Sequence, residues 1–195
     1  MITKKVLRLC LLLAAFFLVF LGASKVQAKD YEIDYTVLKE GSQDASIANG
    51  YFDKPITIYQ EDGQWYLTFK VNHENWISKV TFDGQEAVKH TSLENETGQW
   101  TFKLQSIEEK MDATVKVDIE EEVEGEALSY HHTYPIDFEL DISKSQLTEL
   151  KSALSQAKMY ALYRILIPVV LAALALVIGI YVTVRRKKKS SEKLL

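Results

Sequence analysis

The stretch Gln64-Trp65-Tyr66-Leu67-Thr68-Phe69-Lys70-Val71 places a large apolar side chain at every second position. Successive side chains of a β-strand point to opposite faces, so this alternation predicts a strand with one face in a hydrophobic core. Val115, Val117 and Ile119 repeat the same period later in the chain. These two stretches predict that the folded part of the chain is built from β-sheets.

Other short runs around these two are also rich in β-branched and aromatic residues. Turn-forming sequences separate them, namely Glu61-Asp62-Gly63, Asp83-Gly84, residues 94–98 and Glu124-Gly125. About seven strands at this spacing predict an all-β fold, an immunoglobulin-like antiparallel β-sandwich. The predicted strands cover residues 31–38, 56–59, 65–71, 77–82, 99–104, 113–119 and 127–140.

The N-terminus has the composition of a secretory signal peptide. Lys4, Lys5 and Arg8 precede an apolar run over residues 9–23, and Val26-Gln27-Ala28 then offers a cleavage site made of small residues. We therefore expect residues 1–28 to be a signal peptide that is removed before Lys29. An uncleaved signal anchor is the alternative.

The C-terminal part predicts a membrane anchor. Leu147, Leu150, Leu154 and Ala157 recur at helical spacing, so residues 143–160 are expected to form an amphipathic stalk helix, whose apolar face could also pair with a second copy. Residues 161–184 are expected to be a transmembrane helix, because 165–184 carry no charge and about 20 helical residues cross a bilayer.

The last residues, 185–195, begin with the cluster Arg185-Arg186-Lys187-Lys188-Lys189. A basic cluster beside a membrane span marks its cytoplasmic side, so residues 29–142 are expected to lie outside the cell. A regulatory role for the basic tail is the alternative.

Charge and composition exclude several classes of function. Residues 29–160 carry 12 basic and 26 acidic side chains, a net charge of −14, which would repel a nucleic acid. The chain has no recognisable pair of catalytic carboxylates and no glycine-rich phosphate loop, and its one cysteine, Cys10, lies in the predicted signal peptide. We therefore expect a binding protein and not an enzyme.

The segment Ser129-Tyr130-His131-His132-Thr133-Tyr134 is the most unusual in the chain. On a strand, Tyr130, His132 and Tyr134 share one face, and a tyrosine phenolate is a known ligand of haem iron. The pattern is also compatible with aromatic side chains that cover a sandwich face, or with a metal site at His131-His132. Pro135 removes a ladder N–H, so we expect the strand to lie at a sheet edge or to carry a bulge there.

Three motifs in this order resemble the near-iron transporter (NEAT) domains, the haem-binding modules of Gram-positive surface proteins. They are Tyr130-x-x-x-Tyr134, Asp44-Ala-Ser46-Ile-Ala-Asn-Gly-Tyr51-Phe52 after the first strand, and Asn72-His-Glu-Asn-Trp76-Ile77. The likeness runs from about residue 31 to about residue 140, and the tyrosine pair resembles the iron-regulated surface determinant C type. It implies a sandwich that holds ferric haem (iron protoporphyrin IX) between the late hairpin and a short 3₁₀ helix.

The resemblance also implies a role for each matching residue. Tyr130 matches the ligand of the ferric iron, and Tyr134 matches the residue that hydrogen-bonds its phenolate. The other matches concern the rest of the haem. Ser46 corresponds to a propionate contact, although it could simply cap the short helix, Ile47 to the apolar residue over the distal face, Tyr51 to the aromatic beside the propionates, and Trp76, Val117 and Ile119 to the pocket wall.

The expected function is therefore haem binding and transfer at the surface of a Gram-positive cell. We expect a single-pass membrane protein whose domain lies beneath or within the cell wall, receives haem from other haem-relay surface proteins and passes it to a permease-associated haem lipoprotein for iron acquisition. No LPxTG-like motif precedes the predicted span, so the helix is expected to be the anchor. The alternative is an adhesion or protein-binding domain of the same fold without haem.

Overall fold

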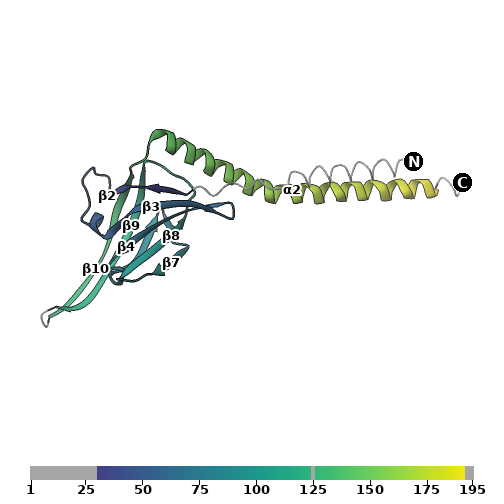
Figure 1. The fold of residues 1–195 in the computed structure, drawn as a ribbon. Helices are drawn as coiled ribbons and strands as arrows, with labels where there is room; N and C mark the ends of the chain where they lie inside the picture. Colours follow the sequence, from purple (N-terminus) through teal and green to yellow (C-terminus); the bar gives the residue numbers. More distant parts are fainter. Residues whose placement is uncertain (1–29, 124–125, 192–195) are drawn as a thin grey trace.

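The computed structural model describes residues 30–123 and 126–191, with the side chains of the C-terminal helix α2 (Lys144–Ser191) described as far as Arg185. Three segments named above lie outside the described part: the predicted signal peptide, the Glu124-Gly125 turn and, for most of its side chains, the predicted basic tail. The described residues form two antiparallel five-stranded sheets, followed by one long helix (Figure 1). This confirms the predicted β-sandwich.

The first sheet has the strand order β1-β3-β4-β8-β7, and the second has the order β2-β10-β9-β5-β6. Two 3₁₀ helices, η1 and η2, connect strands near the second sheet. The bounds of the first sheet are β1 (Tyr31–Ile33), β3 (Phe52–Glu61), β4 (Gln64–Asn72), β8 (Thr97–Lys103) and β7 (Lys89–Ser92). Those of the second sheet and the 3₁₀ helices are β2 (Tyr35–Lys39), β10 (Glu126–Leu140), β9 (Lys110–Val123), β5 (Ile77–Phe82), β6 (Gln85–Glu86), η1 (Ile47–Tyr51) and η2 (Glu74–Trp76).

The core forms where the inward faces of the two sheets meet. In β4 the predicted alternation is observed, with Trp65, Leu67, Phe69 and Val71 buried. The ring of Phe69 stacks on Phe102 of its own sheet at 5.4 Å and lies 5.2 Å from Phe138 of the facing sheet. Aromatic pairs of this kind contribute beyond the area that they bury, so this cluster joins the two layers.

The structure contains more strands than the sequence predicts. The first predicted strand, 31–38, is divided at Asp34, so that β1 and β2 join different sheets. The strands β6 and β7 were not predicted, because their residues are polar and they are held by backbone pairing at sheet edges. The strand β3 begins before Pro55 and not after it, with a register shift between Asp53 and Thr57 that interrupts the alternation.

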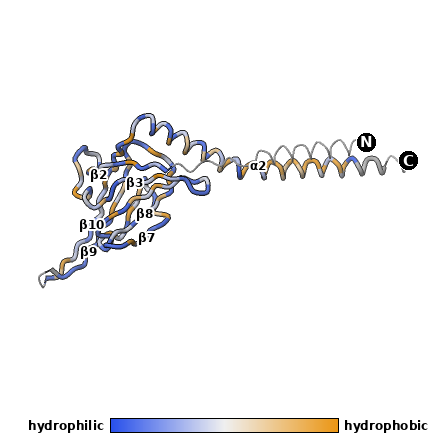
Figure 2. Tube along the Cα trace, viewed as in Figure 1, coloured by the Kyte–Doolittle hydropathy of each residue, from blue (hydrophilic) through white to orange (hydrophobic). Residues whose placement is uncertain are grey.

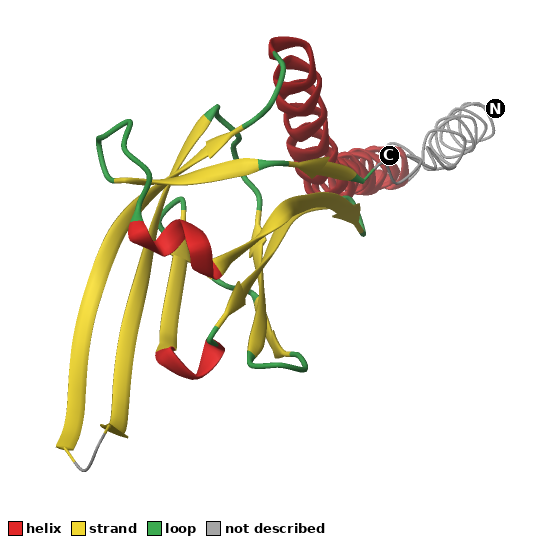
Figure 3. Cartoon of the chain, turned by 60° about the vertical axis from the view of Figure 1, so that its left-hand side comes forward, coloured by secondary structure: helices red, strands yellow, loops and turns green. Residues whose placement is uncertain are grey.

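Pro135 lies where β10 has a partner strand on one side. β10 pairs with β9 in unbroken register from Glu126 to Glu139, whereas its pairing with β2 begins at Ile136. The sequence allowed either a sheet edge or a β-bulge at Pro135. In the structure Pro135 lies at a sheet edge, and β10 has no bulge there. The edge portion of β10 and its partner β9 form a long hairpin that extends beyond the other strands (Figure 3).

The segments predicted as a stalk and a transmembrane helix form one continuous helix, α2 (Lys144–Ser191). Its first turns pack against the sandwich: Leu150 is fully buried, Leu154 and Ala157 are buried, and Lys151 is 2.5 Å from Glu108 before β9. The apolar face of residues 143–160 is therefore part of the domain core and is not free to pair with a second copy.

The remainder of α2 is apolar and exposed. Figure 2 shows the hydrophobic colour concentrated on this part of the helix. The helix is long and apolar enough to cross a membrane. Figures 1 and 3 agree that it leaves the sandwich at the end away from the tip of the β9–β10 hairpin.

Candidate functional site

A cavity of about 580 Å³ lies between η1, η2 and the outer half of the second sheet. Its wall is mostly apolar and aromatic, which is typical of sites for small molecules and cofactors. All eight residues predicted for the site line this one cavity, although they come from four separate parts of the chain. They are Ser46, Ile47, Tyr51, Trp76, Val117, Ile119, Tyr130 and Tyr134.

The strand β10 supplies the two tyrosines. The period of the strand places Tyr130 and Tyr134 on one face, opposite Ile119 and Val115 of β9, and their hydroxyl groups hydrogen-bond to each other. That hydrogen bond raises the pKa of Tyr134, and burial adds to the effect. Tyr134 therefore keeps its proton at neutral pH and can donate it in a hydrogen bond to the oxygen of Tyr130.

His132 lies between the tyrosines, and the centre of its ring is 4.4 Å from that of Tyr134. It is not among the residues that line the cavity. Within the described part of the chain, no three His, Cys, Asp or Glu side chains are placed to hold a metal ion directly. The alternative metal site at His131-His132 thus has no support from the geometry.

The helix η1 covers one side of the cavity mouth. Ser46 is its N-cap, because its Oγ accepts a hydrogen bond from the Ala48 N–H at 3.2 Å. The backbone N–H of Ser46 and the side chain of Asn49 both bond to Val37 of β2, at 2.8 Å each, and so attach η1 to the second sheet. Ile47, the next residue, is 88 % exposed at the mouth.

An aromatic group forms the opposite side. The ring of His73 stacks on Trp76 at 4.5 Å and meets Tyr51 edge-on at 5.8 Å. His73 has a left-handed backbone (φ 55°), a conformation that directs the chain into η2. The Trp76 Nε1–H donates to Glu121 of β9 at 2.6 Å, so this side is also connected to the hairpin.

Several lining residues were not predicted. They include Lys39 at the end of β2, which brings a positive charge to the cavity, and His73, which belongs to the same Asn72–Ile77 stretch that carries the family resemblance. That stretch is the signal that could have identified His73. Lys39 could not be identified in this way, because the fold of β2 against η1 decides its position. The remaining ones are Ala48, Phe52, Asn72, Ile77, Val115 and Leu128.

Comparison with known proteins gives the same family as the sequence resemblance. Residues 24–142 match the family model NEAT, described as the Iron Transport-associated domain. The chain is 33% identical over 144 residues to hemin/hemoglobin-binding protein 1 of Listeria monocytogenes, a match that covers 71% of this chain and 68% of that protein. It is 30% identical over 112 residues to iron-regulated surface determinant protein C of Staphylococcus aureus, covering 56% of this chain and 48% of that one.

The chain thus spans about half the length of the staphylococcal relative. Among solved structures, it is similar to the NEAT5 domain of IsdX2, a B. anthracis hemophore in complex with heme. The TM-score is 0.50 at 27% identity, and the match covers 60% of this chain and 99% of that domain. The family match, the sandwich topology and the Listeria relative together show that this chain belongs to the NEAT (Iron Transport-associated) domain family.

Proposed function

We propose that this chain is a membrane-anchored extracellular protein that binds ferric haem in the cavity and relays it toward a membrane haem transporter. The observation that carries the proposal is the hydrogen-bonded pair Tyr130 and Tyr134 on the wall of an apolar cavity of about 580 Å³. The named relatives support it, since one is called a hemin/hemoglobin-binding protein and a similar solved domain holds heme.

The residues present suit a ferric porphyrin. The flat apolar ring would be held by the cavity wall, to which Trp76, Val117 and Ile119 contribute. Tyr130 would be the iron ligand, because a phenolate is a hard anionic donor that favours Fe(III). Tyr134 would stabilise that phenolate by donating the hydrogen bond described above, as residues around a metal ligand commonly do.

The cavity mouth suits the polar edge of the same molecule. Ser46 and Tyr51 lie there with hydroxyl groups that can donate to a propionate, and Lys39 adds a positive charge. Ile47 would cover the face of the ring opposite Tyr130, and an isoleucine that is 88 % exposed gains the most apolar burial if a ligand fills the space beside it.

The proposed position in the cell is supported by α2 and the tail. A helix able to span the bilayer, followed by Arg185 and further basic residues, would keep the domain on the outer side of the membrane. Because the first turns of α2 pack on the sandwich, the domain would stay close to the membrane. The protein would therefore receive haem from other relay proteins and deliver it to a permease-associated lipoprotein. Its role would be binding and transfer and not catalysis.

Titration of the full-length protein with hemin in detergent micelles tests this function. We expect a Soret band that saturates at one hemin per chain. Tyr130→Phe should lose most of the affinity and Tyr134→Phe less, because the first removes the ligand and the second removes its hydrogen bond. Tyr66→Phe is the matched control. Tyr66 and its stacking partner Tyr59 both lie in the first sheet, away from the cavity, so this variant should bind hemin as the wild type does.

A wild-type spectrum from Tyr130→Phe would contradict the ligand assignment. Absence of any Soret band from the wild-type protein would contradict haem binding altogether and would favour an adhesion domain of the same fold.

A further inference from the structure

A small cluster of polar side chains attaches η2 to the edge of the first sheet. The side chain of Glu74, the first residue of η2, is 14 % exposed. Its Oε1 accepts a hydrogen bond from Ser92 Oγ at 2.6 Å and lies 2.7 Å from His90 Nε2. Ser92 and His90 both belong to β7, the edge strand of that sheet, and none of the three residues lines the cavity.

The backbone of Glu74 is held from the same side. Its N–H donates to the carbonyl of Glu96, in the turn before β8, at 2.8 Å. Glu74 therefore connects η2 to the first sheet twice, once through its side chain and once through its backbone. A carboxylate with so little contact with water depends on these partners, because burying it unpaired would be costly.

Gly98 of β8 leaves the space that the Glu74 side chain occupies. A Cβ at position 98 would lie 2.8 Å from Glu74 Cγ and 3.1 Å from His90 Nε2, both closer than an ordinary contact. Gly98 does not have a left-handed backbone, so space and not conformation favours glycine here. The imidazole of His90 is itself held in place, since it stacks on the ring of Trp100 at 3.9 Å.

The short helix η2 carries one side of the cavity but has little stability of its own. It is three residues long and follows the left-handed His73, and a 3₁₀ turn has poorer hydrogen-bond geometry than an α-helix. Its last residue, Trp76, is held to the second sheet by the hydrogen bond to Glu121. The orientation of the Trp76 and His73 rings therefore also depends on what holds the first residue of η2, which is Glu74.

We propose that Glu74 is a positioning residue for haem binding: by attaching η2 to β7, it holds the rings of Trp76 and His73 in the orientation that forms the cavity wall. The inference rests on the proposed haem binding and adds to it a residue that does not line the cavity. Through Glu74, the edge of the first sheet helps to set the shape of a cavity that the second sheet mainly forms.

Hemin release from the full-length protein in detergent micelles tests this role. The hemin-loaded protein is mixed with excess apomyoglobin, and the dissociation rate is followed by absorbance. Glu74→Ala should release hemin about two- to tenfold faster than the wild type, the range that corresponds to one ordinary hydrogen bond. Glu74→Gln keeps an oxygen that can accept from Ser92, so its rate should lie between the two.

Gly98→Ala disturbs the same contact without changing Glu74. The added methyl group needs the space of Glu74 Cγ, so this variant should also release hemin faster than the wild type. In the Glu74→Ala protein that space is free, and Gly98→Ala should then cause no further acceleration. Two independent changes would instead multiply their effects on the rate.

An NMR spectrum of the haem-free protein reports the position of Trp76 directly. The indole N–H signal of Trp76, which donates to Glu121, should shift in both Glu74→Ala and Gly98→Ala. The indole signal of Trp65, which packs against Tyr31 in the core, is the internal reference and should not shift. A residue that only stabilises the fold would leave the Trp76 signal unchanged.

Two control variants separate positioning from overall stability. Glu108→Ala removes a carboxylate from the ion pair with Lys151 at the α2 end of the sandwich, and it should leave the release rate unchanged. Leu150→Ala removes a fully buried side chain at the same end. It should lower the stability of the protein and still release hemin at the wild-type rate.

The outcomes distinguish this role from the proposed function. If hemin binds, and Glu74→Ala and Gly98→Ala both release it at the wild-type rate, the positioning role is wrong and the haem function stands. If the effects of the two changes multiply, they do not act through a shared contact, and the role is again wrong. An unchanged Trp76 signal in both variants also overturns it. If the wild-type protein binds no hemin, the proposed function itself fails.

Discussion

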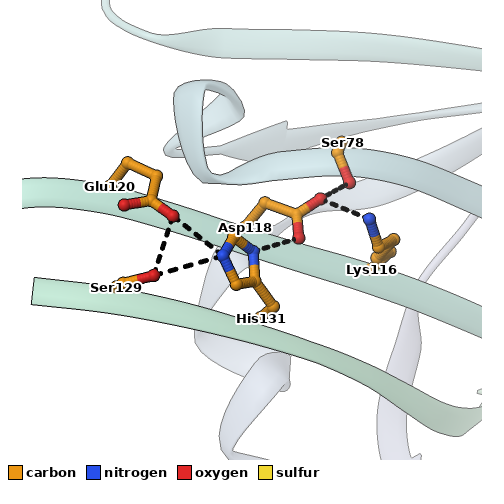
Figure 4. Close-up of polar contacts among 6 residues, drawn as sticks. All are labelled: Ser78, Lys116, Asp118, Glu120, Ser129 and His131. Atoms are coloured by element: carbon orange, nitrogen blue, oxygen red, sulfur yellow. Dashed lines mark hydrogen bonds and ion pairs between the residues drawn. The ribbon is translucent and has the colours of Figure 1, made fainter.

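Tyr130 and Tyr134 are four residues apart, and their hydroxyl groups meet because every second side chain of β10 lies on the same face of the strand. His131, between them in sequence, points the other way and meets Asp118 and Glu120 (Figure 4). One strand thus presents the proposed iron ligand to the cavity and a histidine paired with two carboxylates to its other face. Neighbouring residues have different surroundings because successive side chains of a strand point to opposite faces.

Ser46 is the residue whose two possible roles are easiest to separate. As the N-cap of η1 it can be replaced by Asp, which caps as well as Ser, whereas Ala should cost about 1 kcal/mol of stability. A carboxylate at the mouth would repel the haem propionates. We therefore expect Ser46→Asp to retain the wild-type melting temperature and to bind hemin more weakly.

Two measurements test Ser46→Asp: thermal unfolding monitored by circular dichroism, and the hemin titration. Asn49→Asp, one turn further along η1, would be a poor control, because Asn49 bonds to Val37. Asp44→Asn, an exposed change before η1, is the better one and should alter neither quantity. Unchanged hemin affinity in Ser46→Asp would mean that Ser46 only caps the helix.

At the scale of elements, the two ends of the sandwich have different tasks. The β9–β10 hairpin, η1 and η2 form most of the cavity wall, whereas α2 closes the opposite end of the core. Leu150, Leu154 and Ala157 of α2 belong to the same buried cluster as Tyr31 and Trp65. The helix that would anchor the protein is therefore also a structural part of the domain that it carries.

Truncation of Leu150 tests this coupling. Leu150 is 0 % exposed, so Leu150→Ala should lower the free energy of unfolding by about 2–5 kcal/mol through lost burial and a cavity. Met159→Ala, on the same helix at 45 % exposure, should cost much less. Chemical denaturation in micelles measures both changes. If the Leu150→Ala protein were as stable as the Met159→Ala protein, α2 would not contribute to the stability of the domain.

At the scale of the whole molecule, charge and apolar surface are separated along the chain. Residues 29–160 carry a net charge of −14, and α2 beyond them is apolar and exposed in the described structure. An acidic domain next to an anionic bilayer surface is repelled from it, which would leave its surface open to partners. A partner with a basic rim would associate with it at a rate that falls as salt concentration rises.

Cell fractionation tests the anchor. The full-length protein should remain with the membranes after the cell wall is digested, whereas a chain that ends at residue 163 should be released. The shortened chain keeps Leu150, Leu154 and Ala157, so it should still fold and bind hemin. A chain that ends at residue 142 lacks these core residues and should melt at a lower temperature. Release of the full-length protein by wall-digesting enzymes would contradict membrane anchoring.

The strand alternation, the turn sequences and the three family motifs were sufficient to predict the sandwich and the eight residues that meet in the cavity. Alternation determines which face of a strand a residue occupies, and this is a local property of the sequence. The edge strands β6 and β7 were not predictable in this way, because polar strands at sheet edges carry no apolar period.

Only the tertiary structure decided what each face meets. The period of Leu147, Leu150 and Leu154 predicted an apolar helical face, but not that the sandwich itself would bury it. In the same way, the register of β9 against β10 places Asp118 opposite His131, although the two are 13 residues apart. A sequence period specifies the direction of a side chain, whereas its partner depends on how distant segments pack, and that is why the face of each residue was predictable and its partner in another strand was not.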